Sequence, residues 1–214
     1  MTVPHFFLCH NSPLDPPNNT SVTSPGPVKE GSTVTLTCNA NAYPAVDSYT
    51  WYKVDGDQVT AVGSKRKLST TVSDVDSKFY CEASNKHGTQ NSSITEIDVQ
   101  FAPKETTVII DPPGPVLEGA SVSLLCKSRA NPPVTNYTWF RDAGGEMVGA
   151  EPDFTLNVTK FSEDQYYCEA LNVHGAEHSE AVTFDVTCEI NLLIFARSYY
   201  LKRFAFEICL QKHK

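Results

Sequence analysis

The sequence predicts an all-β chain made of two tandem sandwich domains, each closed by one disulfide. Three observations support this prediction: an internal repeat of about 88 residues, short runs of alternating apolar residues, and cysteines that pair across long intervals. The 14 prolines and 11 glycines also favour many turns over long helices. A chain of 214 residues has room for two such domains.

The repeat is visible in matched motifs. Residues 25–31 (PGPVKEG) recur as residues 113–119 (PGPVLEG), 88 positions later, and Trp51 and Trp139 lie at the same separation. The expected organisation is an irregular or truncated N-terminal segment at 1–13, a first domain at 14–100, a second domain at 103–187 and a basic, aromatic tail at 188–214.

Each copy contains the pattern of an immunoglobulin-like sandwich. Val34, Leu36 and Cys38 alternate with threonines, as in a strand with one buried face, and the second copy repeats this alternation. A tryptophan and a second cysteine then follow in the order typical of this sandwich. The predicted disulfides, each joining opposing sheets beside a core tryptophan, are Cys38–Cys81 with Trp51 and Cys126–Cys168 with Trp139.

The position two residues before the second cysteine is the tyrosine corner of such sandwiches, where a hydroxyl binds backbone a few residues upstream. Tyr166 occupies this position in the second copy, and Phe79 occupies it in the first. Because phenylalanine has no hydroxyl, the first corner is expected to be held by packing alone, at a cost of roughly 1 kcal/mol.

Cysteine usage and glycosylation sequons indicate an oxidising, extracellular environment. None of the seven cysteines has the close spacing of a zinc ribbon or a thioredoxin-like motif, and Cys9, Cys188 and Cys209 lie outside the domain pairs. The five expected glycosylation sites are Asn18, Asn19, Asn91, Asn136 and Asn157. Modification is expected at Asn91 and Asn157, whereas Asn136 is expected to be less accessible because Trp139 is close. We expect the chain to lie outside the plasma membrane, without its signal peptide and anchor.

Charge and motifs argue against nucleic-acid binding and catalysis. The formal net charge of −8 disfavours phosphate backbones, and no catalytic motif, metal site, cofactor or small-molecule substrate is predicted. His87 and His174 are repeat-equivalent, but each is expected to be exposed at a hairpin tip, before a glycine with positive φ. His174 and His178 are four residues apart, but no third metal ligand accompanies them.

Three segments of the second copy resemble C2-set immunoglobulin domains of the Siglec family: GASVSLLC at 119–126, ANPPVTNYTWF at 130–140 and YYCEALNVHG at 166–175. The pattern is similar to the membrane-proximal domains of an inhibitory B-cell co-receptor in that family. Carcinoembryonic-antigen-like and Fc-receptor-like proteins share much of it. The resemblance, over residues 14–187, implies the extracellular part of a cell-surface receptor or adhesion protein that binds other cell-surface or extracellular proteins and glycoproteins.

The resemblance also implies what these domains do not bind. In Siglecs an arginine on strand F of an N-terminal V-set domain holds the sialic acid carboxylate, and residues 79–84 and 166–171 contain no arginine. The intervals between paired cysteines, 43 and 42 residues, leave little room for the additional strands of a V-set domain. We therefore expect protein-binding and spacer modules that do not bind sialic acid directly. A soluble secreted decoy or binding protein is the alternative.

Overall fold

The computed structural model describes residues 15–142, 144–159 and 164–187. Within these ranges every regular element is a β-strand, so the all-β prediction is confirmed. The chain divides into two compact units, Met1–Phe101 and Ala102–Lys214, which we call the first and the second domain. The N-terminal segment, the C-terminal tail and the cysteines at 9, 188 and 209 lie outside the described residues.

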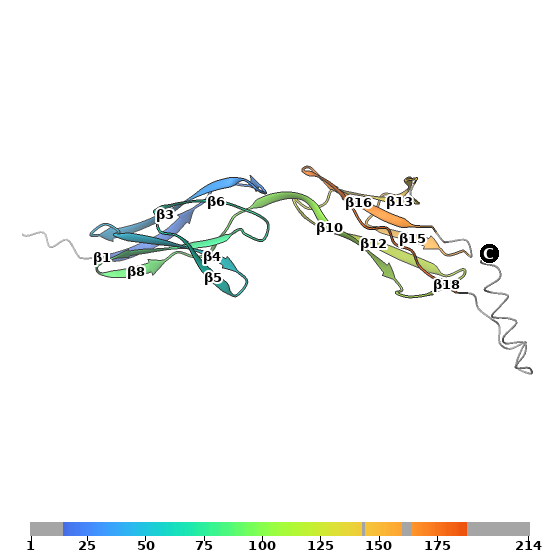
Figure 1. Ribbon diagram of the computed structural model, residues 1–214, viewed down its shortest axis with the longest axis horizontal. Coiled ribbons are helices and arrows are strands. Elements are labelled where there is room, and N and C mark those ends of the chain that lie inside the picture. The colour runs from blue at the N-terminus through green and yellow to red at the C-terminus, as the bar shows by residue number, and fades with distance from the viewer. Residues whose placement is uncertain (1–14, 143, 160–163, 188–214) are drawn as a thin grey trace, which may run out of the picture. The chain divides into compact units, whose positions relative to one another are not determined.

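The first domain is a sandwich of two antiparallel sheets (Figure 1). One sheet has the strand order β1-β3-β6, and the other has the order β5-β4-β7-β8, with β9 also pairing with β7. The strands are β1 (Asp15–Thr23), β2 (Val28–Lys29), β3 (Thr33–Tyr43), β4 (Ser48–Asp55), β5 (Gln58–Gly63), β6 (Lys67–Thr71), β7 (Lys78–Asn85), β8 (Gly88–Asn91) and β9 (Thr95–Glu96).

The second domain repeats this architecture. One sheet has the order β15-β12-β10, the other has the order β14-β13-β16-β17, and β11 pairs with β18. The strands are β10 (Val99–Asp111), β11 (Val116–Leu117), β12 (Ser121–Asn131), β13 (Asn136–Arg141), β14 (Glu146–Gly149), β15 (Asp153–Asn157), β16 (Tyr166–Asn172), β17 (Gly175–His178) and β18 (Val186–Thr187).

The sequence repeat is also a repeat of strand register. Trp51 pairs with Cys81 between β4 and β7, and Trp139 pairs with Cys168 between β13 and β16. A short parallel pairing recurs as well, between Val28 and Val99 in one copy and between Val116 and Val186 in the other. Residues at matching positions of the two copies therefore occupy matching places in the two sandwiches.

The disulfides form the centre of each core. Cys38–Cys81 joins β3 to β7, and Cys126–Cys168 joins β12 to β16, so each bond links the two sheets as predicted. Trp51 and Trp139 are both fully buried. Their indole nitrogens donate hydrogen bonds to the carbonyls of Lys65 (2.8 Å) and Glu151 (2.9 Å), so neither buried N–H lacks a partner.

Phe79, at the corner position of the first copy, is 1% exposed and packs into the core of the first domain. The core contains the predicted alternation, since Val34, Leu36 and Cys38 are all buried while Thr33 and Thr35 are exposed. A half-buried strand with this pattern can place only one face toward the opposing sheet.

The expectation of little room for the additional strands of a V-set domain is met only in part. The strand that follows β4 pairs with β4 itself, and β14 pairs with β13 in the same way, so each domain has one of the two strands that variable-type domains add at this place. The strand fits because the β4–β5 hairpin turns through only two residues, Gly56 and Asp57, with Gly56 at a φ of 54°. A short interval between cysteines therefore does not exclude it.

Candidate functional site

The sheets that contain β4 and β13 carry a repeated aromatic pair on the side away from the core. Trp51 and Cys81 point inward, so the next residue on β4 and the preceding residue on β7, Tyr52 and Tyr80, point outward. Their rings stack with centroids 4.8 Å apart and an interplanar angle of 16°. In the second domain Phe140 and Tyr167 occupy the matching positions and stack at 5.1 Å and 18°.

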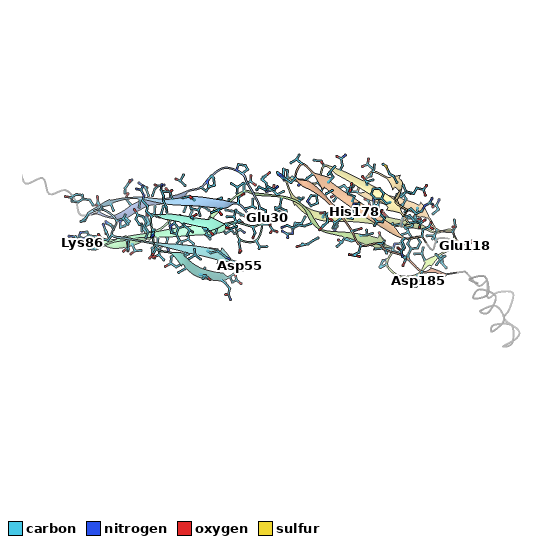
Figure 2. The ribbon with its side chains drawn as sticks, turned by 45° about the horizontal axis from the view of Figure 1, so that its top comes forward. Glu30, Asp55, Lys86, Glu118, His178 and Asp185 are labelled. Atoms are coloured by element: carbon cyan, nitrogen blue, oxygen red, sulfur yellow. A yellow bond between two sulfur atoms is a disulfide. The ribbon has the colours of Figure 1, made fainter. Side chains whose placement is uncertain are left out.

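We call the outer side of β14-β13-β16-β17 the second-domain face and define it by Phe140, Tyr167, His178, Glu169 and Met147. The ring of His178 lies 5.6 Å from Tyr167 and 5.9 Å from Phe140, centroid to centroid. Its Nε2 atom is 3.2 Å from a carboxylate oxygen of Glu169, which is directly opposite it on β16. Met147 lies opposite Phe140 and is 62% exposed. Figure 2 labels His178 on this domain.

The first-domain face is the outer side of β5-β4-β7-β8, defined by Tyr52, Tyr80, Glu82, Val59 and Asn91. Glu82 pairs with Asn91, so an asparagine in a glycosylation sequon takes the place that His178 has in the second domain. Val59 lies on the same side and is 52% exposed. The two faces therefore share a stacked pair and differ in the residue beside it.

A repeated ion pair connects β4 to the turn before β7 in the first domain, and β13 to the turn before β16 in the second. Lys53 Nζ lies 2.6 Å from Asp76, and Arg141 lies 3.9 Å from Asp164 and also pairs with Glu146. The hydrogen bond from Arg141 to Glu146 and the charge of that carboxylate raise the pKa of the arginine. All of these side chains are partly exposed, so the pairs contribute little stability.

Tyr166, at the corner position of the second copy, is 5% exposed and its ring stacks on Phe184 at a centroid distance of 6.2 Å. Burial and the nearby charge of Asp164 raise the pKa of its hydroxyl above the ordinary value. The upstream backbone that a corner hydrogen bond would reach includes residues 160–163, which lie outside the described residues.

The raised pKa of Tyr166 predicts that stability of the second domain falls at alkaline pH. Above about pH 10 the unfolded chain loses this proton before the folded chain does, so the free energy of unfolding decreases as pH rises further. The variant Tyr166→Phe should show a shallower loss of stability over the same pH range. Urea unfolding at several pH values between neutral and alkaline checks this, and identical slopes for both proteins would contradict it.

Two buried asparagines, which the sequence patterns did not single out, fix the loops at one end of each domain. Asn85 Nδ2 donates to the carbonyls of Pro44 and Asp15, both at 3.0 Å, and Asn172 Nδ2 donates to the carbonyl of Pro132 at 2.9 Å. Each Oδ1 accepts a hydrogen bond from the backbone N–H two residues later, at His87 and His174. The recurrence of these asparagines 87 residues apart is the feature of the sequence that could have identified them.

The histidines at these turns only partly match the expectation. His87 is exposed, whereas His174 is half-buried. Gly175 has a φ of 153°, but Gly88 does not have positive φ. Instead, a Cβ at Gly88 would lie 3.0 Å from the Cβ of Pro16, so close approach of β1 explains this glycine.

All five sequon asparagines are exposed. The expectation that Asn136 is poorly accessible was therefore wrong. Trp139 points into the core, and Asn136 begins β13 on the opposite side of the sheet, paired with the exposed Leu171. Asn157 ends β15, where its Oδ1 accepts a hydrogen bond of 2.9 Å from Ser121.

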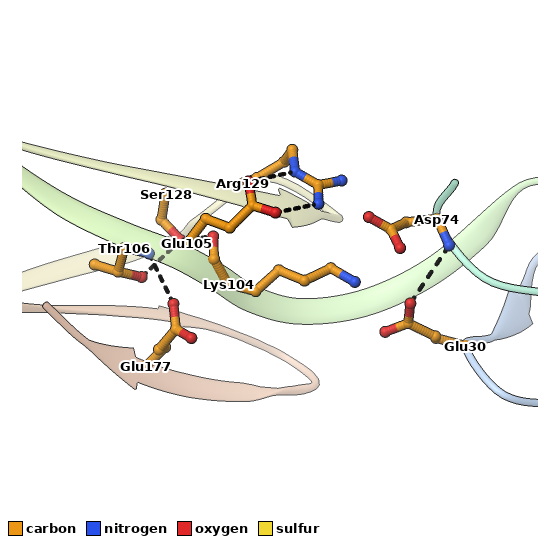
Figure 3. Close-up of polar contacts among 8 residues, drawn as sticks. All are labelled: Glu30, Asp74, Lys104, Glu105, Thr106, Ser128, Arg129 and Glu177. Carbon is orange, nitrogen blue, oxygen red and sulfur yellow. Dashed lines mark hydrogen bonds and ion pairs between the residues drawn. The ribbon is translucent and has the colours of Figure 1, made fainter. Parts of the chain in front are cut away.

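A group of polar contacts surrounds Glu105 and Thr106 of β10 in the second domain (Figure 3). The guanidinium of Arg129 forms a two-point contact with Glu105, at 2.8 and 3.2 Å. Thr106 donates from its hydroxyl to Ser128 (2.9 Å) and from its backbone N–H to Glu177 (2.8 Å). These contacts satisfy polar groups where the chain enters the fold, so we assign them a structural role.

The described residues contain no group of three or more His, Cys, Asp or Glu side chains that could hold a metal ion. Asp164, two residues before β16, is an ion-pair partner of Arg141. In the part of the chain that the structure describes, no helix has the length and apolar character needed to cross a membrane.

Comparisons with known proteins agree with this architecture. Residues 16–85 and 106–187 each match a family model described as an immunoglobulin domain. The chain is 34% identical over 173 residues to mouse B-cell receptor CD22, and 32% identical over 158 residues to human Kin of IRRE-like protein 2. These alignments cover 74% and 72% of the chain but only 20% and 22% of the relatives.

Among solved structures, the chain is similar to immunoglobulin domains 1–4 of Sidekick-1, with a TM-score of 0.55. That alignment has 19% identity and covers 83% of this chain and 49% of the other, which supports the fold alone. The chain spans about a fifth of the length of the curated relatives that it matches. The likeness to CD22 agrees with the predicted Siglec-like pattern. With its two matched domains and one intersheet disulfide in each, the chain belongs to the immunoglobulin superfamily.

Proposed function

We propose that this chain is part of the extracellular region of a cell-surface receptor or adhesion protein, in which the two domains act as protein-binding and spacer modules. The relative named as a B-cell receptor, the disulfide in each domain and the exposed sequons support this location. We propose domain bounds of 14–100 and 103–187. Strand β10, Val99–Asp111, spans the boundary between these two ranges.

The binding proposal rests on the composition of the second-domain face. Phe140 and Tyr167 form a stacked apolar surface beside Met147, and aromatic residues and methionine are enriched where proteins bind one another. His178 and Glu169 supply hydrogen-bonding groups at its border. We therefore propose that the partner is another cell-surface or extracellular protein or glycoprotein that covers this aromatic pair.

The same geometry disfavours direct binding of sialic acid. The outward positions of β16 in the second domain carry Tyr167, Glu169 and Leu171, and those of β7 in the first domain carry Tyr80, Glu82 and Ser84. A carboxylate in the middle of each strand repels the carboxylate of sialic acid, which needs a cationic partner. We further propose that the two domains do not bind a cofactor, a nucleic acid or a small-molecule substrate, and that they do not act as an enzyme.

Cell staining tests the binding proposal. The secreted chain, clustered through an added tag, is applied to a panel of intact cells, and binding is measured by flow cytometry. Phe140→Ser and Tyr167→Ser should each weaken binding at least about tenfold, because a central aromatic residue dominates interface energy. Protease treatment of the cells should abolish binding, and sialidase treatment should leave it unchanged.

Tyr52→Ser is the matched control, because Tyr52 holds the same position in the first domain as Phe140 in the second. It should not alter binding. Asn136→Gln is a second control, since Asn136 lies four residues before Phe140 on β13, roughly 13 Å away along the strand. Binding that survives both second-domain variants, or that sialidase removes, would contradict the proposal.

A further inference from the structure

We propose that Asn91 carries an N-linked glycan whose first sugar packs on the stacked Tyr52–Tyr80 pair and covers the first-domain face. This inference rests on the extracellular location proposed above, because the glycan is added only in the secretory pathway. It does not depend on the identity of any binding partner.

The placement of Asn91 follows from its register. Asn91 pairs with Glu82, and the neighbours of Glu82 on β7, Cys81 and Ala83, are both buried against the core. Residues directly opposite one another share a side of the sheet, so Asn91 points outward with Glu82. Tyr80 lies two residues along β7 on this same side, at the diagonal distance that long side chains can span.

The second domain shows that a group at this position reaches the aromatic pair. His178 has the same register as Asn91, because it pairs with Glu169 as Asn91 pairs with Glu82. Its ring lies 5.6 Å and 5.9 Å from the two stacked rings of that domain. A ring attached to Asn91 would therefore meet Tyr80 and Tyr52 in the way that the imidazole meets Tyr167 and Phe140.

The chemistry of the two groups is complementary. The asparagine side chain has no ring of its own, so the tyrosine pair of the first domain lacks the third ring that the second domain has. One side of an N-acetylglucosamine ring presents C–H groups, and such an apolar surface packs on the negative face of an aromatic ring. The nearby Val59, 52% exposed, extends the apolar surface that the sugar would cover.

The amide of Asn91 is also available for modification. Its side chain is exposed and, within the described residues, makes no hydrogen bond. The next residue, Ser92, is held by its hydroxyl, which accepts a 3.0 Å hydrogen bond from the backbone N–H of Cys81. The sequon is therefore fixed to the sheet edge while its asparagine is directed to solvent.

Hydroxyl-radical footprinting on the full chain, secreted from eukaryotic cells, tests the proposal. Glycans are first trimmed to a single N-acetylglucosamine, and mass spectrometry reports occupancy at Asn91 and labelling at each tyrosine. Ser93→Ala removes the sequon but keeps Asn91. It should raise the labelling of Tyr52 and Tyr80 at least about twofold, because the sugar no longer covers the stacked pair. The labelling of Tyr167 should not change.

Thr159→Ala is the matched control, because it removes the Asn157 sequon on the opposite sheet of the other domain. It should not change labelling of Tyr52 or Tyr80. The converse variant, His178→Asn with Glu180→Thr, creates a sequon at the equivalent position, and its glycan should lower the labelling of Tyr167 by a similar factor relative to His178→Asn alone, which has neither the imidazole nor a sequon.

The outcomes separate this inference from the proposed location. If Asn91 is bare while other sequons are occupied, or if Ser93→Ala leaves the tyrosine labelling unchanged, the inference is wrong and the extracellular location stands. If all five sequons are bare on folded, secreted protein, the location loses its support together with the inference. Occupied Asn91 with protected tyrosines supports both.

Discussion

Replacing Cys126 and Cys168 together by alanine is expected to unfold the second domain while the first stays folded. The disulfide closes a loop over a sequence separation of 42 residues, and the chain-entropy model assigns such a loop about 4 kcal/mol. A small domain has a total stability of only about 5–15 kcal/mol, so the loss is a large part of it. Alanine is the suitable replacement because both cysteines are buried and a serine hydroxyl there would need a partner.

Hydrogen exchange with mass spectrometry measures this effect, because peptides from each domain are followed separately. Peptides covering β12 and β16 should lose most of their protection, and peptides covering β3 and β7 should keep theirs. The reciprocal variant, with alanine at both Cys38 and Cys81, is the matched control and should affect the first domain instead. Unchanged protection across β12 and β16 would show that the disulfide has no major role in stability.

Asn172→Ala is expected to destabilise the second domain by about 2–4 kcal/mol, since two hydrogen bonds of a nearly buried side chain are lost. Asn172 is 4% exposed, donates to the carbonyl of Pro132 and accepts from the backbone N–H of His174. It therefore holds the loop before β13 against the turn after β16. Chemical denaturation with a domain-resolved readout measures the change in the free energy of unfolding.

Two further variants make the result specific. Asn172→Asp keeps an acceptor for the His174 N–H but loses the donor to Pro132, so its cost should be intermediate. Val173→Ala, at the adjacent residue that is 76% exposed, should change stability by less than about 0.5 kcal/mol. A loss in Asn172→Ala no larger than in Val173→Ala would remove the structural role that we assign to this asparagine.

The fold was predictable because its signals are local or repeated. Alternation around Cys38, the cysteine-tryptophan-cysteine order and the repeat together determined two sandwiches with one disulfide each, and the structure confirms them. The strand after β4 was harder to predict. Whether it pairs with β4 or with the opposite sheet depends on a two-residue turn, which the number of residues between cysteines does not reveal.

The candidate site was less predictable because it depends on long-range register. Tyr52 and Tyr80 are both visible as aromatics in the sequence, but only the pairing of β4 with β7 makes them a stacked pair. In the same way, glycine is needed at position 88 because Pro16, which is far from it in the sequence, lies too close for a larger side chain. The accessibility of Asn136 likewise depends on which side of β13 it occupies, not on its distance from Trp139 along the chain.

Peptide mapping under non-reducing conditions, on protein secreted from eukaryotic cells, tests most directly whether this chain is a disulfide-stapled extracellular module. We predict a Cys38–Cys81 peptide pair, a Cys126–Cys168 peptide pair and glycan on exposed sequons, including Asn91. Free thiols at these four cysteines and bare asparagines at every sequon, on protein that is folded, would contradict both the compartment and the function proposed from it.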